Sequence, residues 1–426
     1  MVSTTNSTSL TGGVSGPHDQ SLRARAQAVI PGGMYGHLNM RLMPADYPQF
    51  FASGQGARVV DVDGREFVDL MNSWGPVILG HRHPEVEEAA ARQAALGDCL
   101  NGPSERMVEL AERLVSIVSH ADWAMFEKNG TDATTLCCTI ARAATGRKKI
   151  LVARGAYHGA APWCTPVEAG TTVEDRSNLV RYEYNDLESV RAAAQSVSGD
   201  LAAILVSPFR HDAGYDQELV DPDFARGLRQ LCDETGAALI LDDVRCGFRL
   251  DFGHSWQSIK VEPDLSAWSK AIANGYALAA VLGNDRFRVP AQSLFTTGSF
   301  WYTSVAMAAS LATLDVLERG DAMNNMVSMG TKLREGIESQ AQTWGYEIRQ
   351  TGPVQMPYLS FVGDDDRAVG SLFAAAALRH GVYLHPRHNW FVSAALTEAD
   401  LALALSGTNS AFGELREAGI APPHSA

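Results

Sequence analysis

A lysine at position 270 lies in apolar surroundings, within the segment 266–276 (SAWSKAIANGY). Trp268 precedes it in a strand-like run, and Ala271 and Ile272 follow it. A lysine in an apolar pocket loses its proton more readily, and the neutral amine attacks carbonyl carbons. The segment alone leaves two interpretations open: a lysine that forms a Schiff base, or a structural lysine whose ammonium reaches solvent.

Three further segments carry groups suited to ligand binding. In ILDDVRCGF (240–248), Asp242 ends an apolar strand, and its carboxylate could cap the next helix or hold a cationic nitrogen. In FEKNGTDAT (126–134), a glycine turn leads into a helix, whose first N–H groups form either an anion site or an ordinary helix start. In GAYHGA (155–160), Tyr157 could stack on a flat ligand or pack against the protein.

The order of these groups matches one chemistry. Pyridoxal phosphate needs an anion cradle, an aromatic face, an acid on its pyridine nitrogen and a lysine on its aldehyde. The acid keeps the pyridine nitrogen protonated, and the lysine moves the proton between substrate and cofactor carbons. The sequence therefore predicts a pyridoxal 5'-phosphate enzyme. No metal site is expected, because the six cysteines are scattered and form no CxxC pair.

The elements around these segments predict an α/β fold. Residues 56–75 read as a β-hairpin around Asp63 and Gly64, and 105–118 and 131–146 have helical periodicity. Short apolar runs then alternate with helices, which indicates a mostly parallel sheet covered by helices on both faces. We expect a large domain and a smaller α+β domain, divided as follows: a disordered arm (1–17), an N-terminal segment of the small domain (18–75), the large cofactor-binding domain (76–320) and the C-terminal small domain (321–426).

Composition excludes several other classes of protein. The chain has 426 residues and a formal charge of −14, so a nucleic acid partner is not expected. No apolar run has the length of a membrane span, and the N-terminus lacks the blocks of a secretory signal. Scattered cysteines are typical of reduced cytosolic proteins, so we expect a cytoplasmic enzyme. A nicotinamide dehydrogenase is disfavoured because no GxGxxG follows an early strand.

The chain resembles the class III (omega-type) aminotransferases of pyridoxal-phosphate fold type I, over nearly its whole length after the N-terminal arm. VIPGG (29–33) and SWGPVILGH (73–81) are similar to glutamate-1-semialdehyde aminomutases. The bacterial fumonisin-deaminating aminotransferases are more similar still. That likeness rests on PGGMYGH (31–37), HADWAMFEKNGTDAT (120–134), LDDVRCGFR (241–249), TGSFWYTSVAM (297–307) and GVYLHPRHNWFVSAA (381–395).

The resemblance implies a role for each matching residue. Lys270 binds the cofactor aldehyde, and Asp242 pairs with the pyridine nitrogen. Tyr157 and Val244 cover the two faces of the ring, and His158 supports Asp242 or the ring. The phosphate would be bound by Asn129, Gly130 and Thr131. Thr297 and Ser299 lie where family members reach the phosphate of the other subunit, so a homodimer with shared active sites is expected.

Substrate contacts are harder to assign. Arg41 lies where the aminomutases carry their carboxylate-binding arginine, and Arg387 lies in the C-terminal loop that overhangs the site in this family. Either could bind a substrate carboxylate or form a surface ion pair. Arg245 stands where the family has Gln or Met, and it could hold a structural carboxylate or face the substrate. Trp74 and Trp301 either line the entrance or pack in the core; aromatic walls would favour an apolar amine.

We expect a transaminase that moves an amino group from an apolar or long-chain amine to a keto acid such as pyruvate, in two half-reactions. The alternatives are an aminomutase, which acts on one substrate without an acceptor, and a non-catalytic protein that binds pyridoxal phosphate. Intact Lys270 and Asp242 argue against the second alternative, because binding alone needs neither.

Overall fold

The computed structural model describes residues 15–39 and 47–420. Its large sheet has seven strands in the order β4-β10-β9-β8-β7-β5-β6. Their bounds are β4 Trp123–Glu127, β5 Lys149–Ala153, β6 Leu179–Tyr182, β7 Leu201–Val206, β8 Ala238–Asp242, β9 Leu265–Trp268 and β10 Ala279–Gly283. All neighbouring strands are parallel except β10, which is antiparallel to both β4 and β9. The predicted α/β fold with a mostly parallel sheet is confirmed.

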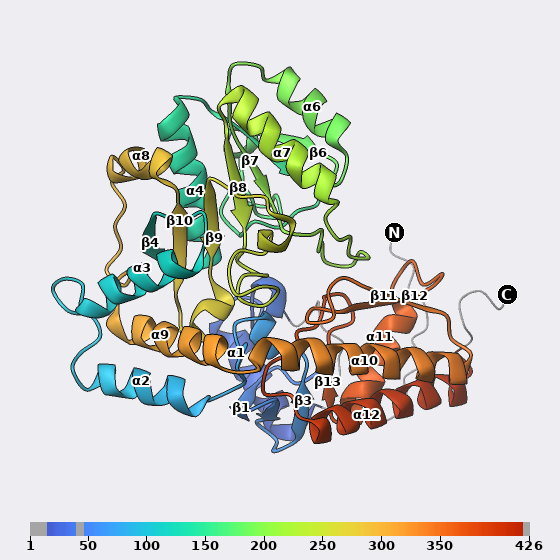
Figure 1. Cartoon of the computed structure of the whole chain (residues 1–426). Helices are drawn as coiled ribbons and strands as arrows, with labels where there is room; N and C mark the ends of the chain where they lie inside the picture. The colour runs from blue at the N-terminus through green and yellow to red at the C-terminus, as the bar shows by residue number, and fades with distance from the viewer. Residues whose placement is uncertain (1–14, 40–46, 421–426) are drawn as a thin grey trace.

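Helices cover both faces of this sheet (Figure 1). One face packs against α4 (Gly130–Thr145) and α8 (Arg288–Gln292), and the other against α6 (Leu187–Ser196) and α7 (Pro222–Thr235). In β5, Ile150 and Val152 join the α4 side, whereas Leu151 and Ala153 join the α6 and α7 side. Successive side chains of a strand point to opposite faces, so a strand buried on both faces must be apolar throughout.

A second sheet is built from both ends of the chain. Its order is β1-β2-β3-β13, with bounds β1 Phe51–Gln55, β2 Arg58–Asp61, β3 Glu66–Asp69 and β13 Val382–Tyr383. The predicted hairpin is present, since β2 and β3 pair antiparallel around Gly64. Strand β13 joins β3 in parallel, so residues more than 300 positions apart share one sheet. A two-stranded sheet, β11 Ile348–Thr351 and β12 Tyr358–Phe361, lies nearby.

The remaining helices wrap around these sheets (Figure 1). Helix α12 packs against both α10 and α11, and α9 packs against α2 and α3. Their bounds are α1 Pro17–Val29, α2 Pro84–Ala94, α3 Glu105–Ile117, α5 Val173–Arg176, α9 Ser304–Arg319, α10 Ala322–Trp344, α11 Ala368–Arg379 and α12 Glu398–Glu417. Within the described residues, none of the helices has the length and apolar character needed to cross a membrane.

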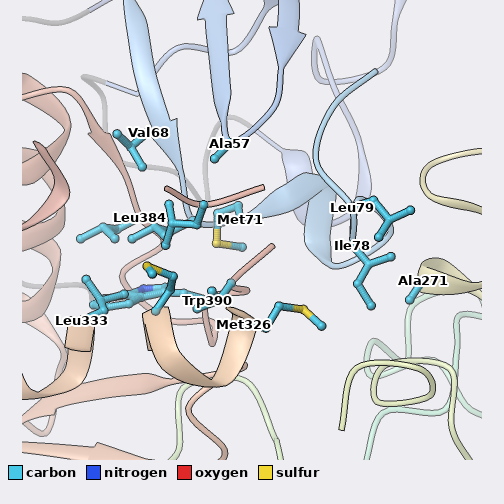
Figure 2. Packing of buried hydrophobic residues seen from close by; sticks show 14 of the residues in the cluster. Ala57, Val68, Met71, Ile78, Leu79, Ala271, Met326, Leu333, Leu384 and Trp390 are labelled. Carbon is cyan, nitrogen blue, oxygen red and sulfur yellow. The ribbon is translucent and has the colours of Figure 1, made fainter. Parts of the chain in front are cut away.

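One hydrophobic core connects the second sheet to the segment after Lys270. Figure 2 shows Val68 and Met71 from the N-terminal part beside Leu384 and Trp390 from the C-terminal part, with Ile78 and Leu79 directed toward Ala271. Ala271 is 1% exposed and follows Lys270 directly. Packing from three regions of the chain therefore fixes the backbone next to the candidate catalytic lysine. The proposed domain boundaries stay a prediction, and most of the predicted arm (1–17) lies outside the described residues.

Candidate active site

A cavity of about 250 Å³ opens at one edge of the large sheet. The parallel strands end there, and β4 points the same way because it is antiparallel to β10, which is antiparallel to β9. Ligand sites of α/β sheets form where the carboxyl ends of strands meet. Eight residues predicted from the sequence line it together: Asn129, Gly130, Thr131, Tyr157, His158, Asp242, Val244 and Lys270.

Lys270 begins a short 3₁₀ turn, Lys270–Ala273, directly after β9. Its φ of 48° is unusual for a residue with a side chain. The turn is held by Asn274, whose Oδ1 accepts from the Leu79 N–H at 2.8 Å and whose Nδ2 donates to the Gly80 carbonyl at 3.0 Å. Burial, and to a smaller extent the nearby positive charge of Arg245, lowers the pKa of Lys270 to about 7. A large share of the lysine is therefore neutral near pH 7.

Asp242, the last residue of β8, is held by two hydrogen bonds. Its Oδ2 lies 2.6 Å from His158 Nδ1, and its Oδ1 accepts from the Val244 N–H at 3.2 Å. The backbone of His158 is fixed in turn, because its carbonyl accepts from Thr134 Oγ1 at 2.7 Å. Both Asp242 and His158 are buried, at 6% and 4% exposure. A buried carboxylate fixed in this way can hold a cationic nitrogen of a ligand.

The N-terminus of α4 forms part of the cavity wall. Asn129 caps the helix, since its Oδ1 accepts from the Asp132 N–H at 3.0 Å. Backbone N–H groups at such a helix start bind anions. Gly130 is required by packing, because a Cβ there would lie 2.5 Å from Val244 Cγ1. The neighbouring Glu127 does not oppose an anion at neutral pH, since burial raises its pKa to about 8.

These groups fit pyridoxal 5'-phosphate. The cavity offers an amine of lowered pKa, a fixed carboxylate, the ring of Tyr157 and an anion site at a helix start. This is the donor set that the cofactor's aldehyde, pyridine nitrogen, ring and phosphate require. Fold and cavity together define a pyridoxal-phosphate-dependent enzyme of fold type I.

The chain belongs to the class III aminotransferases: the family model Aminotransferase class-III matches residues 43–397. It is 48% identical over 410 residues to the aminopentol aminotransferase of Sphingopyxis macrogoltabida, covering 96% of this chain and 97% of that protein. A glutamate-1-semialdehyde 2,1-aminomutase of Desulfitobacterium hafniense (strain Y51) is 32% identical, covering 90% and 95%.

A solved structure, the internal aldimine form of the FumI protein of Sphingopyxis sp. MTA144 with pyridoxal phosphate, superposes with a TM-score of 0.94 at 48% identity. The match covers 96% of this chain and 99% of that one. The predicted class III aminotransferase and its pyridoxal 5'-phosphate cofactor are thereby confirmed. The roles of individual residues stay predictions.

The other predicted residues lie away from the cavity lining. Thr297 and Ser299 are exposed in the loop before α9, where the Ser299 carbonyl accepts from Cys99 Sγ at 3.4 Å. Trp301 lies beside Gly298 in the same loop. Arg387 is exposed, and its Nη2 donates to the Asp366 carbonyl at 3.4 Å. Arg41 lies outside the described residues.

Trp74 is surrounded by three histidines that the sequence did not single out. Its ring centroid lies 4.6 Å from that of His37 and 5.0 Å from those of His385 and His388. Burial lowers the pKa of all three, to about 4 for His385 and well below the usual value for His388. The charge of Lys270 also lowers the pKa of His37 and His388, so these two histidines lie within electrostatic reach of Lys270, although no member of the cluster lines the cavity.

Four lining residues were not singled out from the sequence, Thr134, Gly159, His211 and Ser269, and a fifth, Arg245, was considered only as a residue that could face the substrate. Two of them could have been predicted from their positions after strands. His211 follows β7 and Arg245 follows β8, at the edge where the other ligand groups gather. The three histidines around Trp74 have no such local signal, because they come from loops far apart in the sequence.

Proposed function

We propose that this enzyme takes the amino group of an amino polyol, of the kind named by its aminopentol aminotransferase relative, and passes it to a keto acid such as pyruvate. The observation that carries this proposal is the histidine cluster around Trp74, two of whose histidines feel the charge of Lys270. A neutral imidazole has one donor and one acceptor nitrogen, which suits hydroxyl groups. The indole face of Trp74 suits the apolar part of a long-chain amine.

The chemistry assigns a task to each cavity residue. Pyridoxal phosphate supplies an electron sink for the substrate carbon when it is bound. Lys270, as a neutral amine, binds the cofactor between turnovers, and its Nζ removes and returns the substrate proton. The Asp242 carboxylate would hold the pyridine nitrogen, and His158 would keep that carboxylate oriented. Tyr157 and Val244 enclose the ring, and Asn129, Gly130 and Thr131 bind the phosphate.

We further propose a homodimer in which Thr297 and Ser299 complete the partner's site. Support comes from large apolar side chains exposed on two adjoining loops: Leu96 (78%), Leu100 (48%), Phe295 (94%) and Phe300 (64%). The Cys99 to Ser299 contact brings these loops together. Apolar side chains that gather in this way mark protein interfaces.

Donor specificity can be tested with single-turnover kinetics on three amines, without a keto acid. We expect the second-order rate constant of the donor half-reaction to be about 10-fold or more higher for an aminopentol than for a 2-aminoalkane of equal length without hydroxyls. Each missing hydroxyl leaves one hydrogen bond unmade. Alanine serves as the carboxylate-bearing control. Equal rates for the aminopentol and the plain aminoalkane would contradict recognition of hydroxyls.

Steady-state kinetics separate the transaminase from the aminomutase. We expect parallel reciprocal plots when amine and pyruvate are varied, because the two substrates occupy the enzyme in turn. Glutamate 1-semialdehyde should give no turnover unless an acceptor is added. Turnover of that compound alone, with no reaction of the aminopentol, would replace the transaminase by an aminomutase.

A further inference from the structure

Arg245 presents a buried guanidinium to the cavity that contains Lys270. It is 8% exposed and follows Val244, three residues after Asp242. Its Nη1 donates to the His211 carbonyl at 3.0 Å and to Asn389 Oδ1 at 3.2 Å. These two bonds anchor one nitrogen to the protein. In the described part of the chain, Nε and Nη2 donate to no residue.

The charge of Arg245 has no counterion in the described part of the chain. The nearest acids are otherwise engaged: Asp242 by His158 at 2.6 Å, and Asp212 by Arg210 at 2.9 Å. An unpaired charge is costly to bury, and the cost is recovered when an anion binds. A guanidinium whose Nε and Nη2 are both available binds a carboxylate through two parallel hydrogen bonds.

Other arginines are less suited to this task. Arg249 is fully buried, but its Nη1 and Nη2 donate to the Val392 and Gly75 carbonyls at 2.7 and 2.9 Å, so it is structural. Arg387 is exposed and bound to the Asp366 carbonyl. Arg245 therefore differs from both in lining the cavity with its charge unpaired.

We propose that Arg245 binds the carboxylate of the keto acid acceptor. This inference rests on the proposed function, and it explains how one cavity serves two unlike substrates. The donor presents hydroxyl groups to the histidine cluster, and the acceptor presents a carboxylate to Arg245. Neither half-reaction then requires a surface arginine to move into the site.

The test compares pyruvate with acetaldehyde, which lacks only the carboxylate, in the acceptor half-reaction of enzyme first converted by the amine donor. In Arg245→Gln, the ratio of kcat/KM for pyruvate over acetaldehyde should fall about 30-fold, the loss expected for a charged bidentate contact. In Arg245→Lys the same ratio should fall less than in Arg245→Gln, because the positive charge remains. If Arg245 had only a structural role, Arg245→Gln would lower kcat/KM for pyruvate and for acetaldehyde by the same factor, and the ratio would not change.

A binding measurement without turnover gives a second readout. Propionate should bind the resting holoenzyme in calorimetric titration, and Arg245→Gln should weaken that binding about 10-fold or more. Arg387→Gln is the matched control, for which the pyruvate to acetaldehyde ratio should stay within about 3-fold of wild type, since its guanidinium is exposed. An unchanged ratio in Arg245→Gln, or a collapsed ratio in Arg387→Gln, would overturn the proposal. Failure of the donor to convert the wild-type enzyme would instead overturn the proposed function.

Discussion

The lowered pKa of Lys270 comes mainly from burial. A solvated lysine keeps its proton until pH 10 or so, but burial lowers the pKa of Lys270 to about 7. The turn that follows β9 fixes the backbone of Lys270, because Ala271 and Ile272 pack in the core while the lysine itself lines the cavity. The same segment therefore supplies both the lysine of lowered pKa and the core residues that hold it in place.

This shift predicts the pH dependence of cofactor uptake by the apoenzyme. The amine attacks the aldehyde only when neutral, so the rate should rise about tenfold per pH unit below 7 and level off above about 8. Stopped-flow absorbance measures the rate. A rate that continues to rise tenfold per unit up to pH 10 would mean that Lys270 is an ordinary solvated lysine.

The lowered pKa of Lys270 also makes the free energy of unfolding depend on pH. Between pH 7 and 10 the unfolded chain binds a proton at Lys270 that the folded apoprotein largely does not, so folding is favoured as pH rises. In wild type, folding below pH 10 must release this proton from Lys270, which lowers the free energy of unfolding, whereas the variant Lys270→Met has no proton to release. Urea unfolding of the two apoproteins should show the variant's advantage in unfolding free energy shrinking from pH 7 to pH 10. A constant difference would contradict the lowered pKa.

We expect His158 to be a positioning residue that acts through Asp242, because its Nδ1 lies 2.6 Å from Asp242 Oδ2. His158→Phe removes the hydrogen bond to Asp242 Oδ2 and should lower kcat about 10-fold to 100-fold, while His158→Asn keeps a donor and should recover most of that loss. The cofactor's visible spectrum should shift with pH in His158→Phe but not in His158→Asn. Equal losses in both variants would indicate a packing role.

At the scale of elements, strand ends explain what the sequence could predict. Lys270, Asp242 and Tyr157 were found because each follows an apolar strand, and parallel strands bring their carboxyl ends to one edge. The antiparallel β10 could not be predicted, because its run of apolar residues resembles that of its parallel neighbours. Apolar composition reports burial on both faces, not strand direction.

The start of α4 offers a test of how one element supports another. A Cβ at Gly130 would meet Val244 Cγ1 at 2.5 Å, so Gly130→Ala should displace the helix start and weaken cofactor binding about 10-fold or more. Equilibrium dialysis of the cofactor measures this. Gly102→Ala is the control, because its Cβ would point into open space.

Combining Gly130→Ala with Val244→Ala removes the clash and should restore much of the affinity, although the contact of Val244 is lost. If the double variant binds the cofactor no better than Gly130→Ala, the loss does not arise from this clash.

At the scale of the whole molecule, the site depends on both ends of the chain. Strand β13 pairs with β3, and the histidine cluster joins His37 and Trp74 to His385 and His388. These residues lie in loops without helical or strand periodicity, so no local pattern could indicate that they meet. Tertiary pairing of distant segments alone brings them together, which is why the sequence indicated the residues at the strand ends but not this cluster.

The proposed dimer is also a property of the whole molecule. Phe295→Asp and Phe300→Asp place charges on the exposed apolar loop and should convert dimers to monomers in analytical ultracentrifugation, with weaker retention of cofactor. Val173→Asp is the control, since Val173 is 83% exposed on α5, outside the proposed interface. An unchanged sedimentation coefficient for both phenylalanine variants would contradict the interface.

An absorbance titration of the purified enzyme follows whether Lys270 and the cofactor pass an amino group from an amine to a keto acid. We expect the visible band of the purified enzyme to disappear when an aminopentol is added alone, and to return when pyruvate is added. Lys270→Ala should not complete this cycle. A wild-type band that the amine leaves unchanged, or a Lys270→Ala variant that cycles at the wild-type rate, would contradict this transfer of the amino group.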